Sequence, residues 1–363
     1  MNKEISISEL INQFKESEGK SFTINEQAII AETVERAANR TTVAITVLSI
    51  LGGVFATLAF MGFLLLAVHD SEVGLMAFGL LFIIGSVVLN KVYYKTIIDT
   101  VSVSAFMIGF CMVGFSLEGF GIDDQLLCLI FIGMATAILV INQTYLLSLL
   151  CFLLIFGATF GLLNTNDTLN IFPYLYMVVL ASMLTVVALN ESKIISYGSK
   201  ILKLYRPLFL ANACALIVLL GFSTMADSYT YTQKIFADYS WIASIVCIIA
   251  VLFTISKIKK RYEHEHTILN NGVIYAGTVL ALAPTLFAPA ISGGLLLILL
   301  SYLINNKVSL VLSIVSFIYF ISLYYYNLGY TLLTKSIILF VTGLLFLTAY
   351  MLFINKVKSH EEI

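Results

Sequence analysis

Charged side chains are scarce in this sequence, since Asp, Glu, Lys and Arg make up 11% of its 363 residues. Soluble domains carry roughly 25%, and 60% of this chain is hydrophobic, so water is not its main solvent. The formal net charge of −1 also lacks the basic excess that broad nucleic-acid binding needs. The composition therefore favours a membrane protein and argues against a nucleic-acid partner.

Motifs that carry chemistry are missing as well. We find no GxSxG, HExxH, Walker or glycine-rich phosphate motif in a suitable context. The five cysteines all lie inside apolar runs without CxxC spacing, which is typical of small buried hydrophobes. His264 and His266 lie in a strongly charged segment that is more typical of a solvated loop than of a metal site. The sequence predicts no cofactor, no metal and no catalytic residue; whether the protein is an enzyme stays open, with a non-enzymatic role favoured.

The first forty residues lack a cleavable signal peptide, because they are polar and of mixed charge. We expect the first apolar run to act as the uncleaved targeting signal. Ser6 and Glu9 have the spacing of a helix capping box, and an apolar stripe runs from Ile7 to Phe14. Residues 1–42 are therefore predicted to be a cytoplasmic helical leader docked on the membrane, with a solvated leader as the alternative.

Long apolar runs are what the chain has in abundance. A spanning helix needs about 20 apolar residues, because it crosses ~30 Å of hydrocarbon at ~1.5 Å per residue. Runs of this length without alternating polarity exclude a barrel and leave helices. Twelve runs meet or approach the length, at about 43–68, 73–89, 97–117, 126–141, 144–163, 171–189, 208–225, 241–256, 273–288, 290–304, 308–326 and 336–354.

The basic residues give these runs a direction. Eighteen of the 20 Lys and Arg residues fall on one side of the twelve-span map, and Lys234 and Lys335 fall on the other. Basic residues stay preferentially in the cytoplasm. The sequence thus predicts an all-α polytopic bundle of about twelve transmembrane helices with both termini inside. Its domains are the leader 1–42, a membrane domain 43–356 and a cytoplasmic tail 357–363.

Polar residues inside the runs are the candidates for function, because such residues are costly in hydrocarbon. Asp99 lies two positions inside the third run, where an interfacial cap or a pair with Lys95 is the alternative to a functional role. Asn212 lies deeper, in the seventh run, and is interpreted as glue between helices. Pro284 and Pro289 predict a kink or break that either eases packing or exposes backbone groups to a substrate.

Two further segments carry patterns of their own. Residues 193–206 have lysines and arginine on one side of a helical wheel and apolar residues on the other, which predicts a helix lying in the membrane interface. The predicted outer loop before the last run is rich in tyrosine, including Tyr324 and Tyr325, which suits an aromatic belt. Lys335, against the charge bias, either binds a lipid headgroup, an anionic partner or a substrate, or extends to water.

This tyrosine-rich stretch resembles the C-terminal signature of a bacterial family of multi-pass membrane proteins, domain of unknown function 4401. The likeness rests on YYY at 324–326 and TLLTKS at 331–336, and LSILGGVFA at 48–56 is similar to that family's opening. The resemblance implies a bacterial inner-membrane protein whose gene often neighbours one for a small membrane protein with a GDYxxLxY motif. It implies no activity, so it assigns no site residues.

The hypothesis that follows is a membrane scaffold or partner subunit in the bacterial envelope. Its contact surfaces are expected to be the tyrosine-lysine loop and the leader, and membrane lipids are among its expected partners. The main alternative is a transporter or flippase for a lipid-like or small neutral solute, with Asn212 and the proline break near its path. A membrane-embedded enzyme comes third, because acidic outer loops without paired histidines offer little for catalysis.

Overall fold

The computed structural model is helical throughout the residues that it describes. These are 43–68, 71–92, 96–141, 144–164, 171–196, 199–224, 239–262 and 288–327, with isolated positions between 275 and 340. The leader 1–42, the tail 357–363, Pro284 and Lys335 lie outside them. The principal helices are α3 (Val43–Val68), α4 (Glu72–Val92), α5 (Thr96–Gly119), α6 (Asp124–Ile141), α7 (Tyr145–Asn164), α8 (Phe172–Leu189), α9 (Glu191–Ser196), α10 (Ser199–Thr224), α12 (Ser240–Tyr262), α14 (Pro289–Leu303) and α15 (Lys307–Asn327).

Eight of the described helices are long and apolar enough to cross a membrane. Pro289–Leu303 is a shorter apolar helix, and Phe55–Val68 is the apolar second half of the 26-residue α3. The chain is therefore a helical, multi-pass membrane protein. The predicted runs at 273–288 and 336–354 lie mostly outside the described residues, so the total of twelve stays a prediction.

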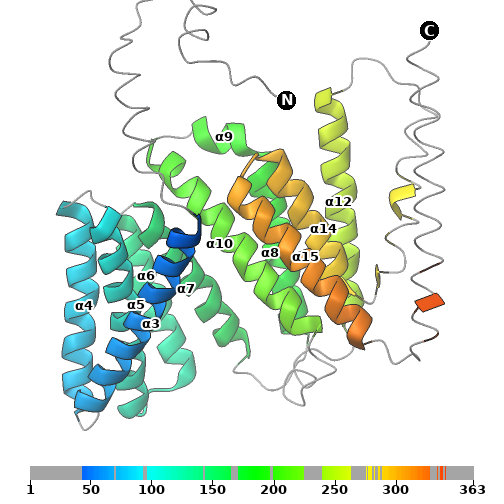
Figure 1. Cartoon of the computed structure of the whole chain (residues 1–363). Helices are drawn as coiled ribbons and strands as arrows, with labels where there is room; N and C mark the ends of the chain where they lie inside the picture. The colour runs from blue at the N-terminus through cyan, green and yellow to red at the C-terminus, as the bar shows by residue number, and fades with distance from the viewer. Residues whose placement is uncertain are drawn as a thin grey trace, which may run out of the picture. The chain divides into compact units, whose positions relative to one another are not determined.

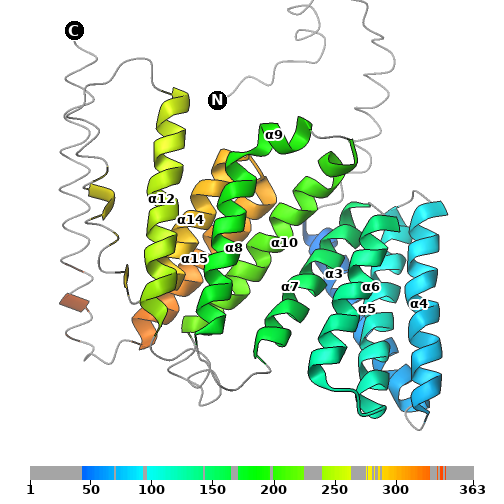
Figure 2. The same cartoon turned by 180° about the vertical axis from the view of Figure 1, so that it is seen from behind.

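The chain divides into two compact units between Ala67 and Val68. The described part of the first unit is α3, which ends at the boundary. None of the 26 residues of α3 is charged. The bounds of α3 are those predicted for the first span. The remaining helices belong to the second unit, in which successive long helices run antiparallel from α4 to α10 (Figures 1 and 2).

Helices α4 and α5 pack closely through small residues at intervals of seven. At one end Ser116 Oγ donates to the Glu72 carbonyl over 2.8 Å, and at the other Ser102 Oγ donates to the Ser86 carbonyl over 2.6 Å. Midway between them Gly79 faces Gly109, where a Cβ on Gly109 would lie 2.8 Å from the Gly79 carbonyl oxygen. Small residues let helix backbones approach in lipid, where packing rather than the hydrophobic effect drives association.

The turn between α5 and α6 is a Schellman motif. Gly121 adopts φ 69°, and its N–H donates to the Glu118 carbonyl over 2.9 Å. The N–H of Ile122 donates to the Leu117 carbonyl over 3.2 Å, which completes the pattern. The turn between α14 and α15 repeats it with Asn305 at φ 56°, a conformation that costs a non-glycine residue free energy. In both places the next helix, α6 or α15, therefore begins only a few residues after the previous helix ends.

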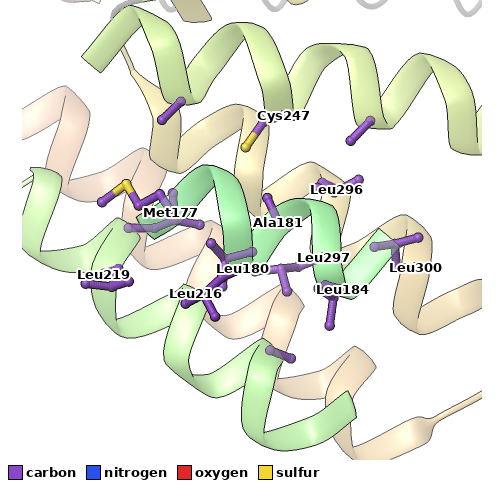
Figure 3. Packing of buried hydrophobic residues seen from close by; sticks show 14 of the residues in the cluster. Met177, Leu180, Ala181, Leu184, Leu216, Leu219, Cys247, Leu296, Leu297 and Leu300 are labelled. Carbon is purple, nitrogen blue, oxygen red and sulfur yellow. The ribbon is translucent and has the colours of Figure 1, made fainter. Parts of the chain in front are cut away.

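Two apolar clusters fill the second unit, and α7 contributes to both. Leu147 and Cys151 of α7 lie in the cluster formed with α4, α5 and α6, and Phe156 lies in the cluster formed with α8, α10, α12, α14 and α15. Figure 3 shows Leu180 of α8 beside Leu216 of α10 in the larger cluster. These side chains interlock at helix interfaces, which supplies the dispersion energy that holds helices together in lipid.

The prediction of one separate helix over 193–206 is wrong, because these residues are divided between two helices. Residues 191–196 form the short α9, and residues 199–206 are the first two turns of α10, which continues through the buried Pro207 into the span. Lys203 and Arg206 are exposed at the start of that helix. Basic side chains reach water as well from the end of a spanning helix as from a helix lying in the interface.

Candidate functional site

The charged side chains that the structure describes in the second unit lie at the two ends of its helices. Glu72, Glu118, Asp123 and Asp124 lie where α4 and α6 begin and α5 ends. The opposite end carries the basic side chains whose exposure is described, which are Lys91, Lys193, Lys203, Arg206, Lys257 and Lys307, together with Glu191. Within the described part of the chain the buried polar side chains are Ser, Thr and Asn. The core between these ends is therefore neutral wherever its side chains are described.

Asn212 is buried in α10 with 1% of its surface exposed. Its Nδ2 donates to the Leu180 carbonyl of α8 over 3.3 Å, while its Oδ1 has no hydrogen-bond partner among the described residues. This hydrogen bond joins α10 to α8, as expected for a polar residue that holds two helices together. The unpartnered oxygen makes the net stabilisation small, because a buried acceptor without a donor costs about 1–3 kcal/mol.

Pro289 is the first residue of α14 and is buried. Proline suits this position because the first helical N–H has no partner within the helix. One turn later Gly293 faces Leu220 of α10, whose Cδ1 would lie 2.6 Å from an added Cβ. Leu220 lies eight residues beyond Asn212, or about 12 Å along the helix. The structure therefore places Pro289 and Asn212 at different depths; Pro284, the other predicted residue of the break, lies outside the described residues.

Tyr324 and Tyr325 lie in the last turn of α15, with 39% and 38% of their surfaces exposed. Tyr326 follows at 80%. Because α15 runs antiparallel to α14 (Figure 1) and begins at Lys307, these tyrosines lie at the end opposite the basic residues. Lys335, predicted to act with them, lies outside the described residues. These three residues, Tyr324, Tyr325 and Tyr326, are called the tyrosine cluster, and each of them is exposed at this end of the helices.

Asp99 lies in the first turn of α5, as predicted. Its side chain is outside the described set, so its cap, pair or functional role stays a prediction. The site residues predicted from sequence thus occupy four helices or undescribed segments, and the described ones do not gather into one centre. No group of three or more metal-binding side chains occurs among the described residues.

Polar contacts that were not predicted join α12, α14 and α15. Cys247 of α12 lies close to Ser292 of α14. Ser301 Oγ of α14 lies 2.7 Å from Ser309 Oγ and 3.3 Å from Ser313 Oγ of α15. Hydroxyl pairs of this kind hold helices together in a membrane. In the sequence, the spacing of Ser309 and Ser313, which are one helical turn apart, could have indicated these contacts between helices.

Two apolar cavities open between helices. One, of about 450 Å³, is lined by α5, α6 and α7, with Glu118 as its charged residue. The other, of about 160 Å³, lies between α7, α8 and α10 beside Gly157 and Cys214. Neither is lined by Asn212 or Pro289. These two cavities suit hydrocarbon rather than a polar solute.

A family model described as domain of unknown function (DUF4401) matches residues 42–355. The match covers most of the chain and contains every helix from α3 to α15. The chain belongs to this family. No curated protein and no solved structure matches it.

Membership in DUF4401 confirms the resemblance carried by residues 48–56, 324–326 and 331–336, which all lie within the match. It assigns no activity, as the family's description states. The geometry of the helices and of their exposed surfaces is therefore the basis for a function.

Proposed function

We propose that this DUF4401 protein is a membrane scaffold or partner subunit in the bacterial envelope. The observation that carries the proposal is the neutral core: the described interior holds apolar side chains together with uncharged hydroxyl and amide groups. Paths for ions or protons are lined by ionisable groups, which are costly in hydrocarbon and retained for function. A packed neutral bundle with exposed tyrosines at one boundary instead suits contact with other membrane components.

The proposal includes twelve spans in the bacterial inner membrane, with both termini in the cytoplasm. The charge distribution supports this orientation, because basic residues favour the cytoplasmic side. Lys91, Arg206, Lys257 and Lys307 lie at one end of the described helices. That end is then cytoplasmic, and the acidic end with the tyrosines of α15 faces outward.

The partner that we propose is the small membrane protein with a GDYxxLxY motif, which the sequence resemblance implies. Its expected contact is the tyrosine cluster at the end of α15, formed by Tyr324, Tyr325 and Tyr326, with Lys335 in the following segment. Aromatic rings supply large contact areas, and tyrosine is enriched where partners dock. Loss of two such rings from a contact is expected to weaken it by tenfold or more.

Co-purification from native membranes tests this contact. The tagged chain with Tyr324→Ala and Tyr325→Ala is expected to lose at least about nine-tenths of the small protein, following the free energies of buried aromatic contacts. The matched control is Val311→Ala with Val315→Ala, which removes exposed apolar side chains from the middle of the same helix. Equal recovery with the tyrosine variant and the wild type contradicts the proposed contact.

A further inference from the structure

The 450 Å³ cavity between α5, α6 and α7 is an open groove, and it forms because α5 packs mainly on α4 while α6 packs mainly on α7. The α5 face that carries Ser102, Gly109 and Ser116 is occupied by α4. Helix α6 pairs mainly with α7, so α5 and α6 diverge beyond their shared turn. Between the two hairpins the rings of Phe110 and Phe131 meet edge to face, with centroids 5.6 Å apart. They leave an apolar groove of about 450 Å³ beside them.

The groove follows one face of α5 for a defined length. Met107, Cys111, Gly114 and Glu118 line it at spacings of four, three and four residues. Eleven residues of α helix extend about 16 Å, close to half of the ~30 Å hydrocarbon layer. The groove therefore runs from one boundary of the membrane to about its middle, which is the depth of a single leaflet.

The walls of the groove suit a hydrocarbon chain. Phe115 on α5 and Leu127 on α6 line it together with Leu154 of α7. Met107 and Phe115 are 46% and 50% exposed, so the groove is open on its side. Methionine and phenylalanine side chains conform to flexible apolar ligands.

The charge at the boundary end restricts the headgroup. Glu118 lines the groove there and is exposed, and Asp123 and Asp124 begin the next helix at the same end. The described basic side chains lie at the other end of the helices. A headgroup with an ammonium is attracted to this end, whereas a net anionic headgroup is repelled.

We propose that the groove is a binding site for one acyl chain of an amine-headed phospholipid, with its ammonium at the Glu118 carboxylate. This site is separate from the tyrosine cluster and does not depend on the proposed scaffold role. It holds a lipid in the leaflet at the acidic end of the bundle.

Native mass spectrometry of the full-length protein tests the site. The protein is delipidated and then titrated with phosphatidylethanolamine or with phosphatidylglycerol of the same acyl chains. We expect one retained lipid, with affinity for phosphatidylethanolamine about two- to fivefold higher, the range that a single exposed ion pair contributes. Glu118→Gln is expected to equalise the two affinities, and the matched control Asp124→Asn to leave the preference intact.

A groove-filling variant locates the lipid. Cys111→Trp projects a bulky ring into the groove and is expected to abolish the retained lipid, while the melting temperature reports that the protein remains folded. A wild-type protein that retains no lipid, or that shows no headgroup preference, overturns the proposal. So does a Glu118→Gln protein with the wild-type preference, or an Asp124→Asn protein without it, because the preference then comes from the acidic end in general.

Discussion

The glycine pair between α4 and α5 gives the sharpest prediction about stability. An added Cβ at Gly79 would lie 2.8 Å from Val113 Cγ2 and 3.0 Å from the Gly109 carbonyl oxygen. The side chain can turn away, but the backbone oxygen cannot, so the two helices must separate. Alanine at Gly79 is therefore expected to disturb the packing of the whole α4–α5 pair.

The loss of stability in Gly79→Ala is estimated by comparison with Gly85→Ala on the same helix, because an added Cβ at Gly85 meets nothing within 4 Å. Both substitutions gain about 1 kcal/mol of helix propensity, so this gain cancels in the comparison. Overpacking costs about 1–3 kcal/mol. At about 2–4 °C per kcal/mol, Gly79→Ala should melt about 2–12 °C below Gly85→Ala.

A thiol-reactive fluorescent dye measures this difference in detergent, because Cys151 and Cys247 are buried and react when the bundle opens. Gly109→Ala should match Gly79→Ala. The double variant should cost less than the sum of the two, since either methyl forces the same separation. Equal melting of Gly79→Ala and Gly85→Ala would refute the close approach of the helices.

Two further predictions concern single residues. Asn212→Leu removes the unpartnered oxygen together with the long bond to Leu180, so the free energy of unfolding should stay within about 1 kcal/mol of wild type. A larger loss, read as a clear fall in melting temperature, would show that Asn212 has a stronger partner. In the turns, Gly121→Ala should destabilise the protein by about 1 kcal/mol and Asn305→Gly should stabilise it by a smaller amount, because both positions have positive φ. The same melting assay should show a lower melting temperature for the first variant and a higher one for the second. Shifts in the same direction would contradict the turn geometry.

Helix positions could be predicted from the sequence because hydrocarbon imposes a length on each apolar run. The bounds of α3 agree at both ends, and those of α7 and α8 agree within one residue. The start of α10 was missed because a helical wheel shows which side of a helix is basic and not how the helix is tilted. Lys203 therefore fitted an interfacial helix as well as the first turns of a span.

The candidate site was less accessible to prediction. The small residues at 79 and 86, with 102, 109 and 116, carried a seven-residue spacing that indicates the α4–α5 contact. The groove beside Glu118 had no such signal, because it depends on which helices pair and which diverge. Asn212 was correctly placed between helices, but its distance from Pro289 along the bundle could not be read from separate runs.

The account depends most on the separation of charge between the two ends of the bundle. Single cysteines at Asp123 and Lys203, in a chain whose five native cysteines are replaced, can be labelled in intact cells with a reagent that does not cross membranes. The account predicts labelling of Asp123→Cys alone, with Lys203→Cys reacting after permeabilisation. Labelling of Lys203→Cys alone would invert the orientation, and labelling of both from outside would contradict the bundle itself.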